Sequence, residues 1–354
     1  MAAANDPVQR TRRLIDGLLN RGYEQTTEQV LRAIARGFNS GIIAQRVAEF
    51  EAEAARLAAV GEPLRADNPV LRALMADLET QMTRSAVLVD GIAEDVQALG
   101  AAAAEMAQRQ LALPGFDERA MGVIGVAWNR VDPEAIRRVV TYTQRADWQA
   151  LISQYTTSGI QQISDAALRG ILNGQNPRTT ARDLVRLIQG ESGSPGLPLW
   201  RANTIMRTLQ LTSYRDASAL FQVVNADLLE PEQIRVATLD ARTCMACIAL
   251  HGTRQPVGTR IDDHWNGRCV GVPVVRGRSQ TTYVRETGEQ WFERLPETQQ
   301  RAAMGHAAYE AWRAGEVRLQ DFVHRHTDPL FGSMVREASL RGMLGAAAQE
   351  FYQR

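Results

Sequence analysis

The middle of this chain reads Leu239-Asp240-Ala241-Arg242-Thr243-Cys244-Met245-Ala246-Cys247 and, after a loop, His264-Trp265-Asn266-Gly267-Arg268-Cys269. These two runs hold all three cysteines of the chain. The Cys-x-x-Cys spacing of the first run lets one tight turn present both thiolates to the same ion. Two close ligand pairs joined by a loop are the usual plan of a structural zinc site. The predicted zinc ligands are Cys244, Cys247, His264 and Cys269, and the ion would fold a segment too short to bury a core of its own.

Other interpretations of these residues remain open at this point. His251 competes with His264 as the fourth ligand, because it follows Cys247 closely in the sequence. We favour His264, which pairs with Cys269 across a single turn. The cysteines could instead be ordinary buried thiols, or Cys244 and Cys247 a redox pair, although no βαβ pattern surrounds them. Their odd number argues against a secreted disulfide framework.

The segments beside the cysteine loop have the pattern of short strands. Residues 233–239 alternate, with Ile234 and Val236 as the apolar positions, and residues 270–275 are a second candidate, which Pro273 confines to the edge of a sheet. Elsewhere apolar residues recur at helical spacing. The predicted helices cover residues 8–57, 69–111, 133–148, 160–172, 178–187, 199–220, 287–294, 297–312 and 319 onward to the end. The predicted fold class is mainly α with a small β-hairpin that holds a zinc-knuckle-like Cys/His loop.

Length and turn-forming residues predict several regions. A chain of 354 residues exceeds the usual size of a single apolar core. The run Leu113-Pro114-Gly115-Phe116 is typical of a turn and is the best first boundary. The predicted regions are a helical N-terminal region at 1–113, a central α+β domain at 114–275 and a helical C-terminal tail at 276–354.

Charge and hydropathy limit the partners of the chain. The 40 basic residues balance the 40 acidic ones, whereas proteins that coat nucleic acid usually carry a basic excess. A local phosphate-contacting patch of Arg268, Arg276, Arg278 and Arg285 remains an alternative. No apolar run is long enough for a signal peptide or for the roughly 20 residues that span a bilayer. We therefore expect a chain that is made in the cytoplasm and has no membrane partner.

A structural zinc ion is favoured over a catalytic one. Four candidate ligands leave no coordination position for a reacting water, and the chain has no His-Glu-x-x-His pattern. Asp262 and Asp263 flank the site and are the candidate bases of the alternative, a zinc-dependent hydrolase or toxin-like effector. We expect no enzymatic activity and no catalytic residues.

The motif residues resemble the phage head morphogenesis family, the minor head proteins of the Mu F type. That family has a helix reading roughly R-A-x-x-I-x-R-T, then D-x-R-T-C-x-x-C-x-x-L-x-G, then H-x-N-x-R-C. The matching residues here are Arg201, Ala202, Ile205, Arg207, Thr208, Asp240, Arg242, Thr243, Cys244, Cys247, Leu250, Gly252, His264, Asn266, Arg268 and Cys269. The family commonly reads H-P-N-C-R-C, so Trp265 and Gly267 replace a proline and a cysteine, and one potential ligand is absent.

The resemblance implies a structural role in the virion. A member of this family is expected in low copy in the head interior or at the portal vertex, where it supports head assembly and DNA packaging or delivery. The implied partners are the portal protein and capsid or scaffold proteins, with packaged DNA bound weakly at most. The amphipathic helices on both sides of the central domain are typical of segments that dock into a larger assembly.

Overall fold

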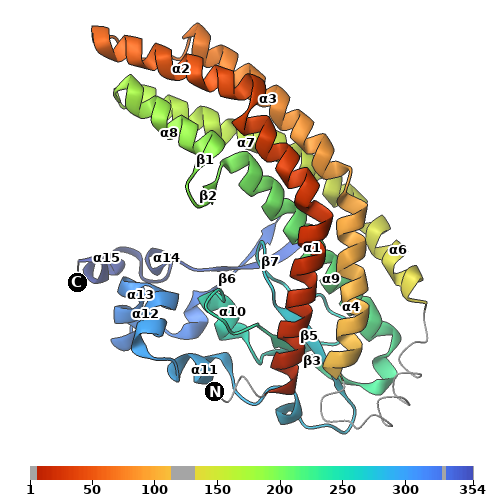
Figure 1. Ribbon diagram of the computed structural model, residues 1–354. Coiled ribbons are helices and arrows are strands. Elements are labelled where there is room, and N and C mark those ends of the chain that lie inside the picture. Colours follow the sequence, from red (N-terminus) through yellow and green to blue (C-terminus); the bar gives the residue numbers. More distant parts are fainter. Residues whose placement is uncertain (1–5, 113–131, 329–331, 354) are drawn as a thin grey trace. The chain divides into compact units, whose positions relative to one another are not determined.

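The computed structural model describes residues 6–112, 132–328 and 332–353 (Figure 1). Helices make up most of these residues, and the strands form small antiparallel sheets of two or three strands. The predicted fold class, mainly α with a small β element that carries a Cys/His cluster, is therefore confirmed.

Two compact units are built from segments that are not consecutive in the chain. We call Tyr23–Val96 with Arg145–Leu209 the helical unit, and the described residues of Met1–Gly22, Gln97–Gln144 and Gln210–Arg354 the sheet unit. The three predicted regions were consecutive stretches of sequence, so their boundaries at 113/114 and 275/276 stay predictions. The turn predicted at residues 113–116 lies outside the described residues.

The helical unit is built mainly of helices packed against one another. Its elements are α2 (Gly41–Val60), α3 (Pro69–Asp90), α7 (Arg145–Leu172), α8 (Pro177–Gln189), the ladder β1 (Gly190–Glu191) and β2 (Ser194–Pro195), the later part of α1 (Pro7–Asn39) and the first part of α9 (Leu197–Val224). Helix α2 packs against α3 and α8, and α7 packs against the same two helices. The buried residues of α2 recur every three or four positions, which is the spacing that brings side chains to one helical face: Ile43, Val47, Phe50, Ala54 and Leu57.

Local capping chemistry sets the ends of these helices. Asn68 and Asn176 each precede a proline in the first turn, and each amide oxygen accepts a backbone N–H of the helix that follows. Helix α2 ends at Gly61, whose φ of 71° is left-handed. Because the chain breaks at Ser40 and again at Gly91, each of the long predicted helices at 8–57 and 69–111 is two helices.

The sheet unit is organised around a three-stranded antiparallel sheet of order β4-β3-β5. Strand β3 (Leu229–Val236) is central, between β4 (Arg254–Pro256) and β5 (Val270–Val275). The predicted strand at 270–275 coincides with β5, and the one predicted at 233–239 overlaps β3. Pro273 lies opposite Gln233 on an edge strand, as its missing N–H predicts.

Two apolar clusters hold the sheet unit together. Val236 and Val272 of the sheet pack with Leu19 of α1, Tyr214 of α9 and residues of α4 (Ala93–Ala112) and α6 (Pro133–Thr143). The second cluster includes Cys247 and Cys269 and lies among the C-terminal helices.

The remaining elements of this unit are η2 (Ala226–Leu228), α10 (Met245–Leu250), η3 (Gln280–Thr282), α11 (Gly288–Glu293), α12 (Glu297–Met304), α13 (His306–Arg313), η4 (Leu319–Phe322), β6 (Val323–Asp328), β7 (Gly332–Glu337), α14 (Leu340–Leu344), η5 (Gly345–Ala347) and α15 (Ala348–Tyr352).

The C-terminal segment departs from the prediction of continuous helix after residue 319. Strands β6 and β7 form an antiparallel hairpin there, and only short helices follow it. Val335 of β7 is fully buried with Ala246 and Leu250 of α10, so tertiary packing supports the extended conformation. The predicted helix at 297–312 is two helices, because Gly305 adopts a left-handed φ of 81° between them.

Candidate metal centre

The first ligand pair is positioned by the short helix α10. Cys244 is its N-cap residue, and the Cys244 Sγ accepts a hydrogen bond from the backbone N–H of Cys247 at 3.4 Å. The chain enters this turn through Leu239, whose φ of 53° is unusual for a residue with a branched side chain. Asn266 has a φ of 58° in the second half of the motif, where asparagine is one of the residues that tolerate this conformation.

The four predicted ligands lie close together. The Nε2 atom of His264 lies 3.3 Å from the Sγ of Cys244 and 3.4 Å from the Sγ of Cys247. The donor atoms of Cys247, Cys269 and Asp263 lie within 4.8 Å of one another. Cys247 thus belongs to both groups and joins them into one cluster of three sulfurs and an imidazole. This donor set fits a metal ion that prefers sulfur and nitrogen.

The candidate ligands differ in their pKa values and therefore in which of them carries a proton. The hydrogen bond from Cys247 lowers the pKa of Cys244 to about 4, which favours the thiolate that binds metal ions. Cys247 retains its proton, because its hydrogen bonds with Cys244 and Cys269 and its burial raise its pKa. Burial opposes a charge on His264, but Cys244 and Asp263 raise the pKa of His264 to about 10. A binding cation would therefore displace protons from Cys247 and His264.

Asp263 organises the second half of the site. Its side chain is buried, and its two oxygens accept hydrogen bonds from the backbone N–H groups of His264 and Cys269, both at 2.9 Å. Arg215 donates to the same carboxylate at 2.8 Å, and Arg235 lies 3.5 Å away. Burial opposes its charge, yet these arginines lower the pKa of Asp263 to about 2. Asp263, considered above as a candidate base, is therefore engaged as a buried structural anion.

Two buried arginines were not recognised from the sequence. Arg215 of α9 donates from Nε to the carbonyl of Cys269 at 3.3 Å and from Nη2 to the carbonyl of Gly267. Arg235 of β3 donates from Nη1 to both the carboxylate and the carbonyl of Asp262. The sequence gives little signal for either arginine, because Arg215 shares its face of α9 with polar residues such as Ser218 and Gln222, and Arg235 lies singly between Ile234 and Val236.

Asp240 and Arg268 tie the two halves of the motif together. The guanidinium of Arg268 donates to both oxygens of Asp240, at 2.6 and 2.7 Å, in the bidentate geometry that makes such pairs strong. The Oδ1 of Asp240 also accepts the N–H of Arg242 and the hydroxyl of Thr243, which shapes the turn before Cys244. These contacts explain why aspartate, threonine and arginine accompany the cysteines. Because its guanidinium is engaged by Asp240, Arg268 does not support the alternative phosphate-contacting patch.

Gly267 makes room for Asp263. A Cβ at position 267 would lie only 2.3 Å from the carboxyl carbon of Asp263, a distance that real side chains do not tolerate. The buried carboxylate thus occupies the space that a side chain at position 267 would need, and glycine is the residue that fits there.

His251 lies outside the ligand cluster and has a structural partner. Its Nδ1 accepts the backbone N–H of Ala237 at 3.1 Å, and burial lowers its pKa to about 4, so the imidazole is neutral. Among the described residues, neither group of potential metal ligands includes it. This arrangement favours His264 over His251 as the imidazole ligand.

Replacing the two histidines separately should distinguish their roles. We expect His264→Ala to lose bound metal, because it removes the nitrogen donor of the cluster. His251→Ala should keep the metal but lower stability by about 1–3 kcal/mol, since it leaves the buried N–H of Ala237 without an acceptor. Metal content per purified chain and chemical unfolding would measure both effects. Loss of metal from His251→Ala with retention in His264→Ala would reverse the assignment.

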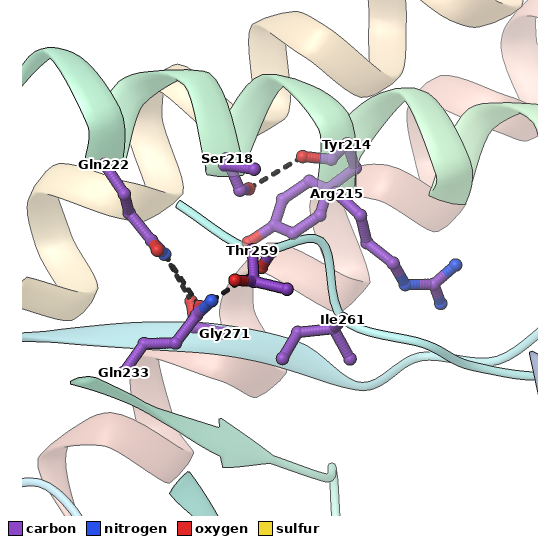
Figure 2. A pocket seen from close by; sticks show the side chains of 9 residues that line it. Tyr214, Arg215, Ser218, Gln222, Gln233, Thr259, Ile261 and Gly271 are labelled. Atoms are coloured by element: carbon purple, nitrogen blue, oxygen red, sulfur yellow. Dashed lines mark hydrogen bonds between the residues drawn. The ribbon is translucent and has the colours of Figure 1, made fainter. Parts of the chain in front are cut away.

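A small cavity lies beside the centre but has no room for a ligand. Figure 2 shows Gln222 and Gln233 directed toward each other across it, while Arg215 extends in another direction. Its volume is about 10 Å³, which is space for about one water molecule. The Gln222 amide donates to the side chains of Gln108 and Gln233 at 3.0 Å, so the network fastens α9 to α4 and to the sheet.

In the part of the chain that the structure describes, no helix is both long enough and apolar enough to cross a membrane. No protein-family model, no curated protein and no solved structure matches the chain. The resemblance to the Mu F type therefore rests on the motif residues alone.

Proposed function

We propose that this chain is a minor head protein of the Mu F type that supports head assembly at the portal vertex, with a structural zinc ion in its sheet unit. The observation that carries the proposal is the convergence of Cys244, Cys247, His264 and Cys269 on one point, joined by the Asp240–Arg268 pair of the same motif. Six of the residues that carry the family resemblance thus lie in or beside the candidate centre.

Zinc is the cation that this donor set suits best. Sulfur and nitrogen atoms bound to one tetrahedral zinc ion lie roughly 3.5 Å apart, given Zn–S and Zn–N bonds of about 2.3 and 2.0 Å. The Sγ–Nε2 distances of 3.3 and 3.4 Å at His264 agree with that value. Bound zinc would hold the two motif halves together through ligands that Asp263 and Asp240 already orient.

A structural role is supported by the state of the candidate bases. Asp263 is held by two arginines and two backbone N–H groups, and Asp262 pairs with Arg235 and Arg325 at 2.7 and 3.1 Å. Both carboxylates are thus engaged by arginines, which supports a structural role for them rather than that of a base. Three sulfurs and one imidazole also complete a tetrahedral shell, so zinc would supply folding energy rather than catalysis.

The helical unit supports an assembly role. Large apolar side chains project from its helices, with Trp200 half-exposed on α9 and Leu172 exposed at the end of α7. Tryptophan is enriched where proteins contact one another. We propose that this unit contacts the portal or the inner capsid, and that packaged DNA is at most a weak partner because the net charge is +0.

Particle reconstitution tests the proposal. The full chain would be co-expressed with the portal and capsid proteins of the same genome, and purified particles would be probed for it. We expect the chain to enter the particles, and the double variant Leu172→Ser/Trp200→Ser to enter at a several-fold lower level while keeping its metal. Exclusion of the unaltered chain from particles, or metal-dependent turnover of a nucleic acid or peptide, would overturn the assembly role.

A further inference from the structure

We propose that the beginning of helix α1 is part of the metal centre, with Arg12 and Asp16 as positioning residues for the peptide that carries Cys269. The inference rests on the proposed metal binding of the Cys/His cluster. It adds two residues that lie more than 200 positions away in the sequence from every ligand.

The peptide group between Arg268 and Cys269 is held on both sides. Its carbonyl oxygen accepts a hydrogen bond from Nη2 of Arg12, and its N–H donates to Asp263 at 2.9 Å. Rotation of this peptide would move the Sγ of Cys269 away from the other donors. Arg12 and Asp263 together therefore fix the orientation of this peptide group.

Asp16 holds the same residue through its side chain. Its carboxylate lies 3.2 Å from Nη1 of Arg268, the arginine that also pairs with Asp240. The Arg268 side chain thus pairs with α1 through Asp16 and with the turn that precedes Cys244 through Asp240. About two turns before Asp16, Gln9 of α1 donates to the carbonyl of Ala237 at 3.1 Å. Helix α1 consequently contacts the chain before the first ligand pair and within the second.

Fold stability alone does not explain why an arginine occupies the buried position 12. Its side chain is buried, its ion pair with Asp16 is long at 3.7 Å, and its Nε and Nη1 atoms have no hydrogen-bond partner among the described residues. Burying a guanidinium with so few partners is unfavourable, and an apolar residue of similar size would often be more stabilising. Val8, Ile15 and Leu19 already anchor the same face of α1 in the apolar core. The particular contribution of Arg12 is its contact with the loop that carries the ligand.

The test separates a positioning role from a structural one. In Arg12→Met, we expect zinc to dissociate about 10- to 100-fold faster into a chromophoric chelator, the range typical of partners that orient metal ligands. The midpoint of thermal unfolding of the metal-free chain should change little, because the ion pair between Arg12 and Asp16 is long and Asp16 keeps its closer pair with Arg268. Cobalt substituted for zinc should keep its absorption bands, since the four ligands are the same.

Matched variants complete the experiment. Arg13→Met alters an exposed arginine of the same helix and should dissociate zinc at the rate of the unaltered chain. Arg12→Lys keeps the charge and a donor and should restore part of the slow dissociation. Should Arg12→Met not fold, Asp16→Asn keeps the side-chain shape and weakens the ion pairs of Asp16, of which the one with Arg268 is the shortest, and is expected to accelerate zinc loss several-fold.

The outcomes also distinguish this inference from the function on which it rests. An unaltered chain that binds zinc, together with unchanged dissociation in Arg12→Met and in Asp16→Asn, would overturn the inference alone. A parallel fall in metal-free stability and zinc retention would assign Arg12 a structural role and overturn it as well. An unaltered chain that binds no zinc would overturn both the inference and the proposed centre.

Discussion

Asp263→Ala is expected to destabilise the sheet unit by about 3–5 kcal/mol, the range observed when one partner of a buried ion pair is removed. The substitution leaves Arg215 and Arg235 buried beside the site without their shared carboxylate. It also removes the acceptor for the backbone N–H groups of His264 and Cys269. Chemical unfolding at saturating zinc, with the metal-free chain measured in parallel, would determine the loss.

The adjacent carboxylate provides a matched control. Asp262 also pairs with Arg235, but its side chain is partly exposed and accepts no backbone N–H of a ligand residue. Asp262→Ala should therefore lower stability by about 1 kcal/mol, as is usual for ion pairs near the surface. Equal losses in the two variants would show that Asp263 has no special role in the buried network.

Cys247→Ser is expected to abolish the stabilisation that zinc gives to the unaltered chain. A ligand that binds only the folded state adds about 4 kcal/mol when its free concentration is 1,000 times the dissociation constant. Cys247 is the donor shared by both groups of potential ligands, so its loss divides the cluster. Unfolding with zinc and with a chelator, together with elemental analysis, would measure the effect.

The metal-free state supplies the comparison for this variant. Because serine is close in size to cysteine, the variant and the unaltered chain should differ by no more than about 1–2 kcal/mol in the presence of chelator. The difference should widen only when zinc is added. A variant that retains one zinc ion per chain, or an unaltered chain indifferent to chelator, would contradict the proposed centre.

The sequence alone predicted the parts of this protein that depend on short stretches of chain. The Cys-x-x-Cys turn, the His264–Cys269 pair and strand β5 each follow from residue types at local spacings. Pro273 marked an edge strand because a missing N–H has the same consequence in any sheet. Most helices followed from the periodicity of their apolar residues in the same way.

The C-terminal hairpin was decided by packing. Strand β6 has mostly polar residues between Val323 and Asp328, so its alternation carries little apolar signal. Val335 of β7 is buried against α10, an element that lies far away in the sequence. Strand propensity depends on such neighbours more than on the residue itself, and the segment was therefore assigned to helix.

The surroundings of the candidate metal centre were likewise decided by tertiary structure. Arg12 and Asp16 come from α1, Arg215 from α9 and Arg235 from β3, and no spacing within the motif connects them to the ligands. Candidate metal ligands can be recognised in a sequence because two short turns must each bring a pair of ligands to one ion, which fixes the spacing within each pair. The charges that orient those ligands can come from any element that packs nearby, and only the folded chain determines which ones do.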